Sequence, residues 1–218
     1  MIAGPSWGPP ESDPLVVRRV LLLLLLANTR CVGLSVAGPV AVSIPESQTQ
    51  NLQINIIEGS NQNTKGLNIG LLNRVNDRMV GMQFGLYNLA DRLEGLQLGY
   101  GGRARIARGA QIGAGSFAGS IDGAQISIVL NIADEVRGVQ LAIVANGTRD
   151  AESAGQLALV NWSDSRSLFQ IGLVNVTDGQ ALIQIGLFNV APANLLPFFP
   201  LINIEPFYFF PRTDPAGP

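Results

Sequence analysis

The sequence predicts an all-β protein built as a repeat β-solenoid, and three observations carry that prediction. Apolar residues alternate with small or polar ones over short stretches, Gln or Asn returns at a nearly constant spacing, and charged residues gather between the alternating stretches. The alternation has the period of a strand, because successive side chains of a strand point to opposite faces. A constant spacing over most of a chain indicates stacked repeats, and we expect about ten coils of roughly 14 residues each.

The N-terminal residues 1–37 are expected to form an extension and a signal peptide. Arg18 and Arg19 precede an apolar stretch at residues 20–27, which is too short for a helix that spans a membrane. Small residues at Ser35 and Ala37 occupy the two positions that a signal peptidase reads, which predicts cleavage before residue 38. We therefore expect an exported protein, located at the cell surface or in the outer membrane or periplasm of a bacterium.

A lipoprotein is the alternative at this end of the chain. Cys31, the single cysteine, follows the apolar stretch and is a candidate for lipidation. Thr29 and Arg30 argue against it, because small residues are expected just before a lipidated cysteine. Cleavage before residue 38 would remove Cys31 from the mature protein.

The rest of the chain divides into a linker at residues 38–51, a repeat domain at residues 52–204, and a C-terminal cap and tail at residues 205–218. Within the repeat domain the anchor positions are Gln53, Asn68, Gln83, Gln97, Gln111, Gln125, Gln140, Gln156, Gln170 and Gln184. A second series has the same spacing and consists of Asn73, Asn88, Asn131, Asn146, Asn161, Asn175, Asn189 and Asn203. The segment that follows Asn194 is rich in Phe and Pro and is expected to cover the last open edge of the stack.

The alternation places Leu96 and Leu98 on one face of a strand and Gln97 on the other. In a solenoid the repeated amides would stack into ladders, in which each amide donates to one copy and accepts from the next. We expect the aliphatic face to fill the narrow interior of the coil. Asparagines are expected at coil corners, where the left-handed backbone region is needed.

An antiparallel meander closed into an outer-membrane β-barrel, acting as a pore or anchor, is the alternative fold. The uncharged spans at residues 79–90 and 123–133 are long enough for membrane strands. Against this alternative, Asn88 has the same parity as Phe84 and Leu86, so an amide would recur on the lipid side. Antiparallel neighbours would also place successive asparagines at opposite ends of the wall.

The iterated G-x-Q-x-G-x-x-N unit and the closing Pro-Phe-Phe-Pro at residues 197–200 resemble a bacterial surface-repeat family first recognised in leptospiral spirochaetes. The resemblance covers residues 52–204 and implies export to the cell envelope or surface, in a family mostly of unknown function. The chain departs from the unit where Gly101, Gly102, Ser116 and Ser127 replace the expected residues. A thinner or bent part of the stack is expected there.

The composition offers no chemistry that we can assign. The chain has no histidine, its carboxylates lie in turns, and no glycine-rich loop precedes a helix, so we expect no enzyme activity, no catalytic residue, no cofactor and no metal site. A net charge of −2 without a basic stripe argues against nucleic-acid binding. We expect a structural or adhesive role with other envelope or surface components as partners, membrane association as an open possibility, and no small-molecule substrate.

Overall fold

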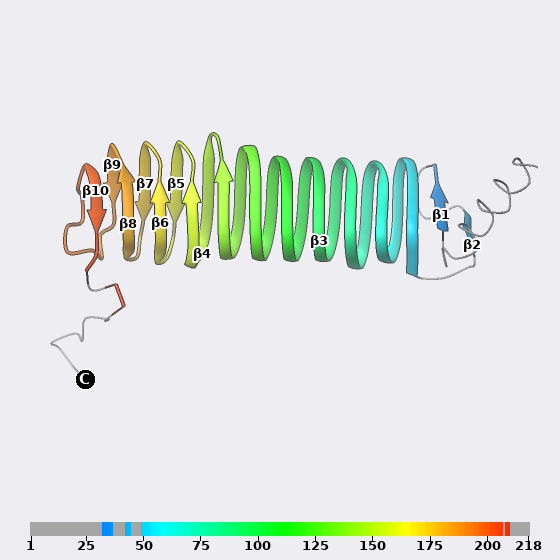
Figure 1. Cartoon of the computed structure of the whole chain (residues 1–218), viewed down its shortest axis with the longest axis horizontal. Coiled ribbons are helices and arrows are strands. Elements are labelled where there is room, and N and C mark those ends of the chain that lie inside the picture. The colour runs from blue at the N-terminus through cyan, green and yellow to red at the C-terminus, as the bar shows by residue number, and fades with distance from the viewer. Residues whose placement is uncertain (1–31, 37–41, 45–48, 207, 210–218) are drawn as a thin grey trace, which may run out of the picture.

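The structure, a computed structural model, describes residues 32–36, 42–44, 49–206, 208 and 209, and it is a β-solenoid (Figure 1). Its strands are β1 (Val32–Ser35), β2 (Val42–Ile44), β3 (Thr49–Ala142), β4 (Ala145–Leu157), β5 (Val160–Ser163), β6 (Ser167–Ile171), β7 (Val174–Thr177), β8 (Ala181–Gly186), β9 (Phe188–Val190) and β10 (Leu201–Ile204). β3 is not a straight strand, because its chain winds through successive coils while it stays extended. The predicted fold class is confirmed.

Successive units pair in parallel and in register. Gln140 lies opposite Gln156 in the β3–β4 pair, Gln156 opposite Gln170 in β4–β6, and Gln170 opposite Gln184 in β6–β8. Equivalent residues therefore lie directly above one another along the axis. The antiparallel barrel that the sequence left open is wrong, because it requires neighbouring units to pair in opposite directions.

Each end of the stack carries an antiparallel strand. β2 pairs antiparallel with β1, and β10 pairs antiparallel with β8, so the parallel order stops at both ends. An antiparallel bridge joins Val190 to Phe198 in the Phe- and Pro-rich closing segment. β1 pairs with residues 52–55 of β3, although the sequence assigns its residues to the signal peptide. The predicted cleavage site and Cys31 lie outside the described residues.

A ladder of glutamines occupies the interior. From Gln97 onward, each glutamine donates through Nε2 to Oε1 of the glutamine one coil before it, at 2.7–3.0 Å. The members are Gln83, Gln97, Gln111, Gln125, Gln140, Gln156, Gln170 and Gln184, each at most 2% exposed. From Gln111 onward, Nε2 also donates to a backbone carbonyl on the opposite wall, as Gln170 does to Val176 at 3.1 Å. The glutamines therefore join neighbouring coils and also the two walls of one coil.

An asparagine ladder runs beside the glutamine ladder with its donors in the opposite direction. Asn131 donates through Nδ2 to Oδ1 of Asn146, and the same bond continues through Asn161 and Asn175 to Asn189, at 2.8–3.0 Å. Glutamines donate toward the N-terminal coil and asparagines toward the C-terminal coil. The aligned amide dipoles of the two ladders therefore oppose each other along the axis.

The ladders confirm the predicted stacking, but the prediction for the interior was wrong. Gln97 is 1% exposed and faces inward, whereas Leu98 is 37% exposed and faces outward. The interior at these positions consists of amides, and the aliphatic side chains cover the outside. The physical reason is that an amide in the ladder has a hydrogen-bond partner in every coil, so its burial leaves few polar groups unpaired.

In the first part of the stack, a glycine forms the corner two residues before each ladder amide, from Asn68 to Gln140. Gly81, Gly95, Gly109, Gly123 and Gly138 all have positive φ values, and Gly95 has φ 137°. A Cβ at Gly95 would lie 2.0 Å from the backbone oxygen of Gly81. The prediction that asparagines occupy left-handed corners was wrong, because no asparagine among the described residues has a positive φ. Among the described residues, Leu201 is the one non-glycine with a positive φ.

The apolar core lies at the other end of the coil. It is formed by Val75, Met79, Ala90, Leu93, Ala104, Ala107, Ile121, Ala133 and Val136. In later coils, the positions that stack on Ala133 hold the buried residues Thr148, Ser163 and Thr177. Their hydroxyls donate to backbone carbonyls, such as that of Asp150 for Thr148. The core is therefore apolar in the first part of the stack and hydroxylated in the second.

Candidate interaction surface

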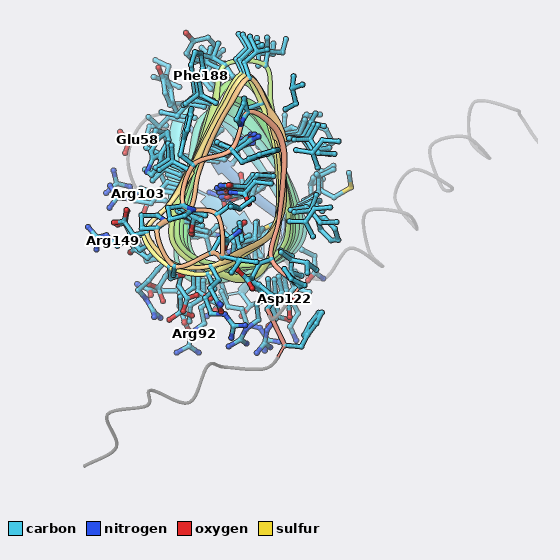
Figure 2. The ribbon with its side chains drawn as sticks, turned by 90° about the vertical axis from the view of Figure 1, so that its left-hand side faces the viewer. Glu58, Arg92, Arg103, Asp122, Arg149 and Phe188 are labelled. Carbon is cyan, nitrogen blue, oxygen red and sulfur yellow. The ribbon has the colours of Figure 1, made fainter. Side chains whose placement is uncertain are left out.

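Each coil from residue 66 onward has two chemically distinct halves, which we name the apex half and the base half. The apex halves are residues 66–73, 81–88, 95–102, 109–116, 123–131, 138–146, 155–161, 169–175 and 183–189, and none contains a charged residue. The base halves are residues 74–80, 89–94, 103–108, 117–122, 132–137, 147–154, 162–168 and 176–182, and each contains at least one. Figure 2 looks along the stack and shows Phe188 at the narrow end, with Arg92 and Asp122 at the opposite end.

The outside of the apex halves carries two rows of apolar side chains, all large except Ala114, which together we name the apolar surface. The wall row follows the ladder amides and comprises Ile69, Phe84, Leu98, Ile112, Ile126, Leu141, Leu157, Ile171 and Ile185. The apex row comprises Leu71, Leu86, Tyr100, Ala114, Ile128, Ile143, Leu159, Leu173 and Leu187. Ile128 and Ile143 are 62% and 63% exposed. Because every coil contributes, the apolar surface is continuous along the stack. Ordinary protein surfaces expose apolar residues mostly one at a time.

The polar groups of the apex halves are turned away from this surface. Side-chain amides bond to one another inside, and the backbone groups of each wall pair with the coils before and after it. A solenoid has open strand edges only at its two ends. The apex halves therefore present mainly aliphatic groups and aromatic rings to their surroundings, with most of their hydrogen bonds formed inside the stack.

The base half carries charges of both signs, which pair between neighbouring coils. Arg78 lies 2.7 Å from Glu94, and Arg105 donates to both carboxylate oxygens of Asp91 at 2.7 and 2.9 Å. The hydrogen bonds from Arg105 lower the pKa of the Asp91 carboxyl, and those from Arg78 lower the pKa of Glu94. These groups are solvent-exposed, so each pair contributes little to stability.

An open groove interrupts one wall where the sequence departs from the repeat. Gly101 and Gly102 take the places of a large outer residue and a ladder asparagine, and the hollow left between Tyr87 and Phe117 has a volume of about 970 Å³. Asn88 accepts from Asn73, but the next coil offers it no asparagine, and its Nδ2 donates to the Leu98 carbonyl. The glutamine ladder continues through that next coil by way of Gln97. The departure therefore thins one wall without breaking the stack.

Metal-ligating side chains do not cluster in the part of the chain that the structure describes. Within the described ranges, no group of three or more Asp, Glu, Cys or His residues lies close enough to hold a metal ion. The carboxylates near the groove, Asp91 and Asp134, lie in ion pairs with Arg105 and Arg149. The described part of the chain also contains no helix that is long and apolar enough to cross a membrane.

No protein-family model, curated protein or solved structure matches this chain. The apolar surface is the feature of the molecule that calls for a binding partner, because water is a poor solvent for it.

Sequence reasoning found the rows of this surface but placed them inside. A signal for the correct orientation was present. The ladder position is glutamine in coil after coil, while the position after it holds Phe84, Leu98 or Ile112. Interior side chains of a stack must keep one shape, because each is enclosed by its copies, whereas exterior ones are free to differ in size.

Proposed function

We propose that this chain is an exported, non-enzymatic structural or adhesive protein of a bacterial envelope or surface, and that it acts through its apolar surface. The observation that carries the proposal is the separation, in each coil from residue 66 onward, of uncharged apex halves from the base halves that hold all the charged residues. A protein that stayed monomeric in water would gain nothing from aliphatic side chains outside and amides inside. The arrangement is favourable when something apolar covers the surface.

The N-terminal sequence supports export, since Arg18 and Arg19 precede a short apolar stretch that ends near small residues. The resemblance of the G-x-Q-x-G-x-x-N unit to a surface-repeat family points the same way. The rigid stack also suits a structural role, because each coil is held to the next by backbone bonds and by two amide ladders.

Cell fractionation tests this proposal. A tagged full-length chain, expressed in a diderm bacterium, is expected in the envelope or outside the cell, and the Arg18→Glu, Arg19→Glu variant is expected to remain in the cytosol. Recovery of the unaltered chain in the cytosol would overturn the proposal.

Sequencing the N-terminus of the exported form tests the leader. Cleavage before residue 38 would remove β1, whereas cleavage before Val32 would keep the strand that pairs with residues 52–55. The predicted outcome is a new N-terminus at Gly38. Detection of Met1 on the exported protein would exclude a cleaved signal peptide.

A further inference from the structure

We propose that the apex halves insert into one leaflet of a lipid bilayer, so that the solenoid lies on a membrane with its axis parallel to the surface. This inference deepens the proposed function and rests on it. It names the occupant of the apolar surface as lipid. The argument uses the satisfied polar groups, the shape of the apolar surface and the position of the charges.

Lipid tails offer no hydrogen-bond partners, so a segment enters them only when its polar groups are satisfied internally. The apex halves meet this condition along the stack, apart from Asn68 Nδ2 and Gln83 Nε2 near its N-terminal end. Their backbone groups pair with neighbouring coils, and Asn161 and Gln170 show how interior amides find both side-chain and backbone partners. An open strand edge, which lipid would not tolerate, occurs only at the ends.

The apolar surface wraps around an edge and does not form a flat face. The wall row, the apex row and the outer residues of the second wall, among them Val160 and Phe188, cover both sides of the narrow end. A flat interface with a second copy would cover one side and leave the other in water. Fluid acyl chains surround a wedge from both sides.

The depth of the wedge fits one leaflet. The wall from the corner at Gly95 to the edge at Tyr100 is about 16 Å long at the usual strand rise. The hydrocarbon part of one leaflet is about 15 Å thick, half of a typical bilayer core. The first charged residue beyond the edge in this coil, Arg103, lies on the flank between Phe188 and Arg92 (Figure 2). Its backbone is about 10 Å from the edge at the same strand rise, so its long side chain would have to extend toward the headgroups.

The charges define the orientation in the same way as in an amphipathic helix at an interface. From residue 66 to residue 190, every charged residue belongs to a base half. Arg92, Asp122 and Arg149 would therefore remain in water while Phe188 at the narrow end is immersed (Figure 2). Both signs are present at the base, so the binding is expected to depend on apolar burial and only weakly on anionic lipid.

Flotation with phosphatidylcholine vesicles tests the inference on the purified full-length chain. The unaltered protein is expected to float with the vesicles at low and at high salt. The Ile128→Glu, Ile143→Glu variant places charges on adjacent coils of the apex row, and its partitioning is expected to fall by about tenfold or more. Both side chains are exposed, so circular dichroism is expected to show an unchanged fold.

A matched control adds the same charge to the base. Ser120→Glu with Gln180→Glu lies in the base halves 117–122 and 176–182 and is expected to float like the unaltered protein. Loss of flotation in this control as well would mean that charge, and not the apolar surface, governs binding, and would overturn the inference.

Depth is measured with brominated acyl chains. In a background in which Trp7 and Trp162 are replaced by Phe, tryptophan introduced as Ile143→Trp is expected to be quenched, and tryptophan introduced as Arg92→Trp is expected to be unaffected. Equal quenching at both positions would contradict the proposed orientation.

The remaining outcomes separate lipid from other occupants. An unaltered protein that ignores vesicles and sediments as a discrete dimer, which Ile128→Glu with Ile143→Glu dissociates, would assign the surface to a second copy and overturn the lipid assignment. An exported protein that fails to float would refute this inference alone. A cytosolic protein would refute the proposed function.

Discussion

The apex half and the base half of each coil follow opposite rules. In the base half, Leu93 is buried and Arg92 faces water, as in any soluble protein. In the apex half, Gln97 is buried and Leu98 faces outward. The two halves alternate along the chain only a few residues apart. We therefore attribute their opposite placement of apolar side chains to a difference in what surrounds each half. A repeat fold permits this, because a ladder makes amide burial inexpensive in every coil at once.

Gly95→Ala is expected to have the largest effect, since it acts at a corner between the two halves. Its Cβ would lie 2.0 Å from the Gly81 backbone oxygen, at a φ of 137° that side chains rarely adopt. Two coils would have to separate, which we expect to cost more than about 4 kcal/mol and to lower the urea midpoint sharply. Gly115→Ala is the control, because its Cβ would lie 3.5 Å from Phe117 in ordinary contact, and it is expected to be nearly neutral. Equal loss in both variants would show that the corner has no special role.

Gln111→Leu reverses the pattern inside the apex half. The substitution removes the donor to Gln97 and the acceptor of Gln125, and buried polar groups without partners cost about 1–3 kcal/mol each. We expect a loss of about 2–5 kcal/mol in the free energy of unfolding, measured by urea titration. Ile126→Gln makes the opposite exchange on the wall row and is expected to change stability by less than about 0.5 kcal/mol in water. A stabilising Gln111→Leu would show that the interior is an ordinary apolar core.

Asn68→Gln is expected to stabilise the stack. Asn68 occupies the ladder position one coil before Gln83, and neither Asn68 Nδ2 nor Gln83 Nε2 has a hydrogen-bond partner in the structure. A longer side chain at residue 68 would bring an acceptor within reach of Gln83 and extend the ladder by one member. The gain is expected to be about 1 kcal/mol, seen as a higher urea midpoint. Asn68→Leu, which fills space without an acceptor, is the control and is expected to destabilise.

The period, the strand content and the stacking of like residues were predictable because they depend on spacing alone. Gln156, Gln170 and Gln184 are separated by one repeat each, and the only way to use such regularity in a stack is to place them over one another. The orientation of the coil was not predictable in the same way. Alternation defines two faces without saying which one is enclosed, and the usual rule that apolar residues are inside fails where a ladder satisfies the amides.

The groove and the pairing at the ends of the stack could not be predicted from the sequence, for different reasons. The hollow at Gly101 depends on which wall loses its side chains, and that follows from where the coil turns. The pairing of β1 with residues 52–55 joins segments that share no ladder residue, so no repeat position marks it in the sequence. Such contacts come from packing at the ends of the stack, where the repeat itself stops.

Lowering the pH is expected to weaken the ion pairs of the base half and to leave the contacts of the apex half unchanged. Of the predicted changes in stability, this one is expected to be the smallest. The pKa of Asp91 is lowered in the folded state by its hydrogen bonds with Arg105. Its contribution to stability is therefore present above the ordinary pKa of an aspartate, about 3.9, and is lost as the pH falls through the lower folded value. The urea midpoint is expected to decline slightly between about pH 5 and about pH 2, and Asp91→Asn is expected to flatten that decline. Asp122→Asn is the matched control, because Asp122 has no ion pair within the described part of the chain, and it is expected to leave the decline in place.

The apex halves contain no titratable carboxylate, so vesicle flotation is expected to remain constant over the same pH range. A parallel loss of flotation would mean that the charged base, and not the apolar surface, holds the protein on lipid.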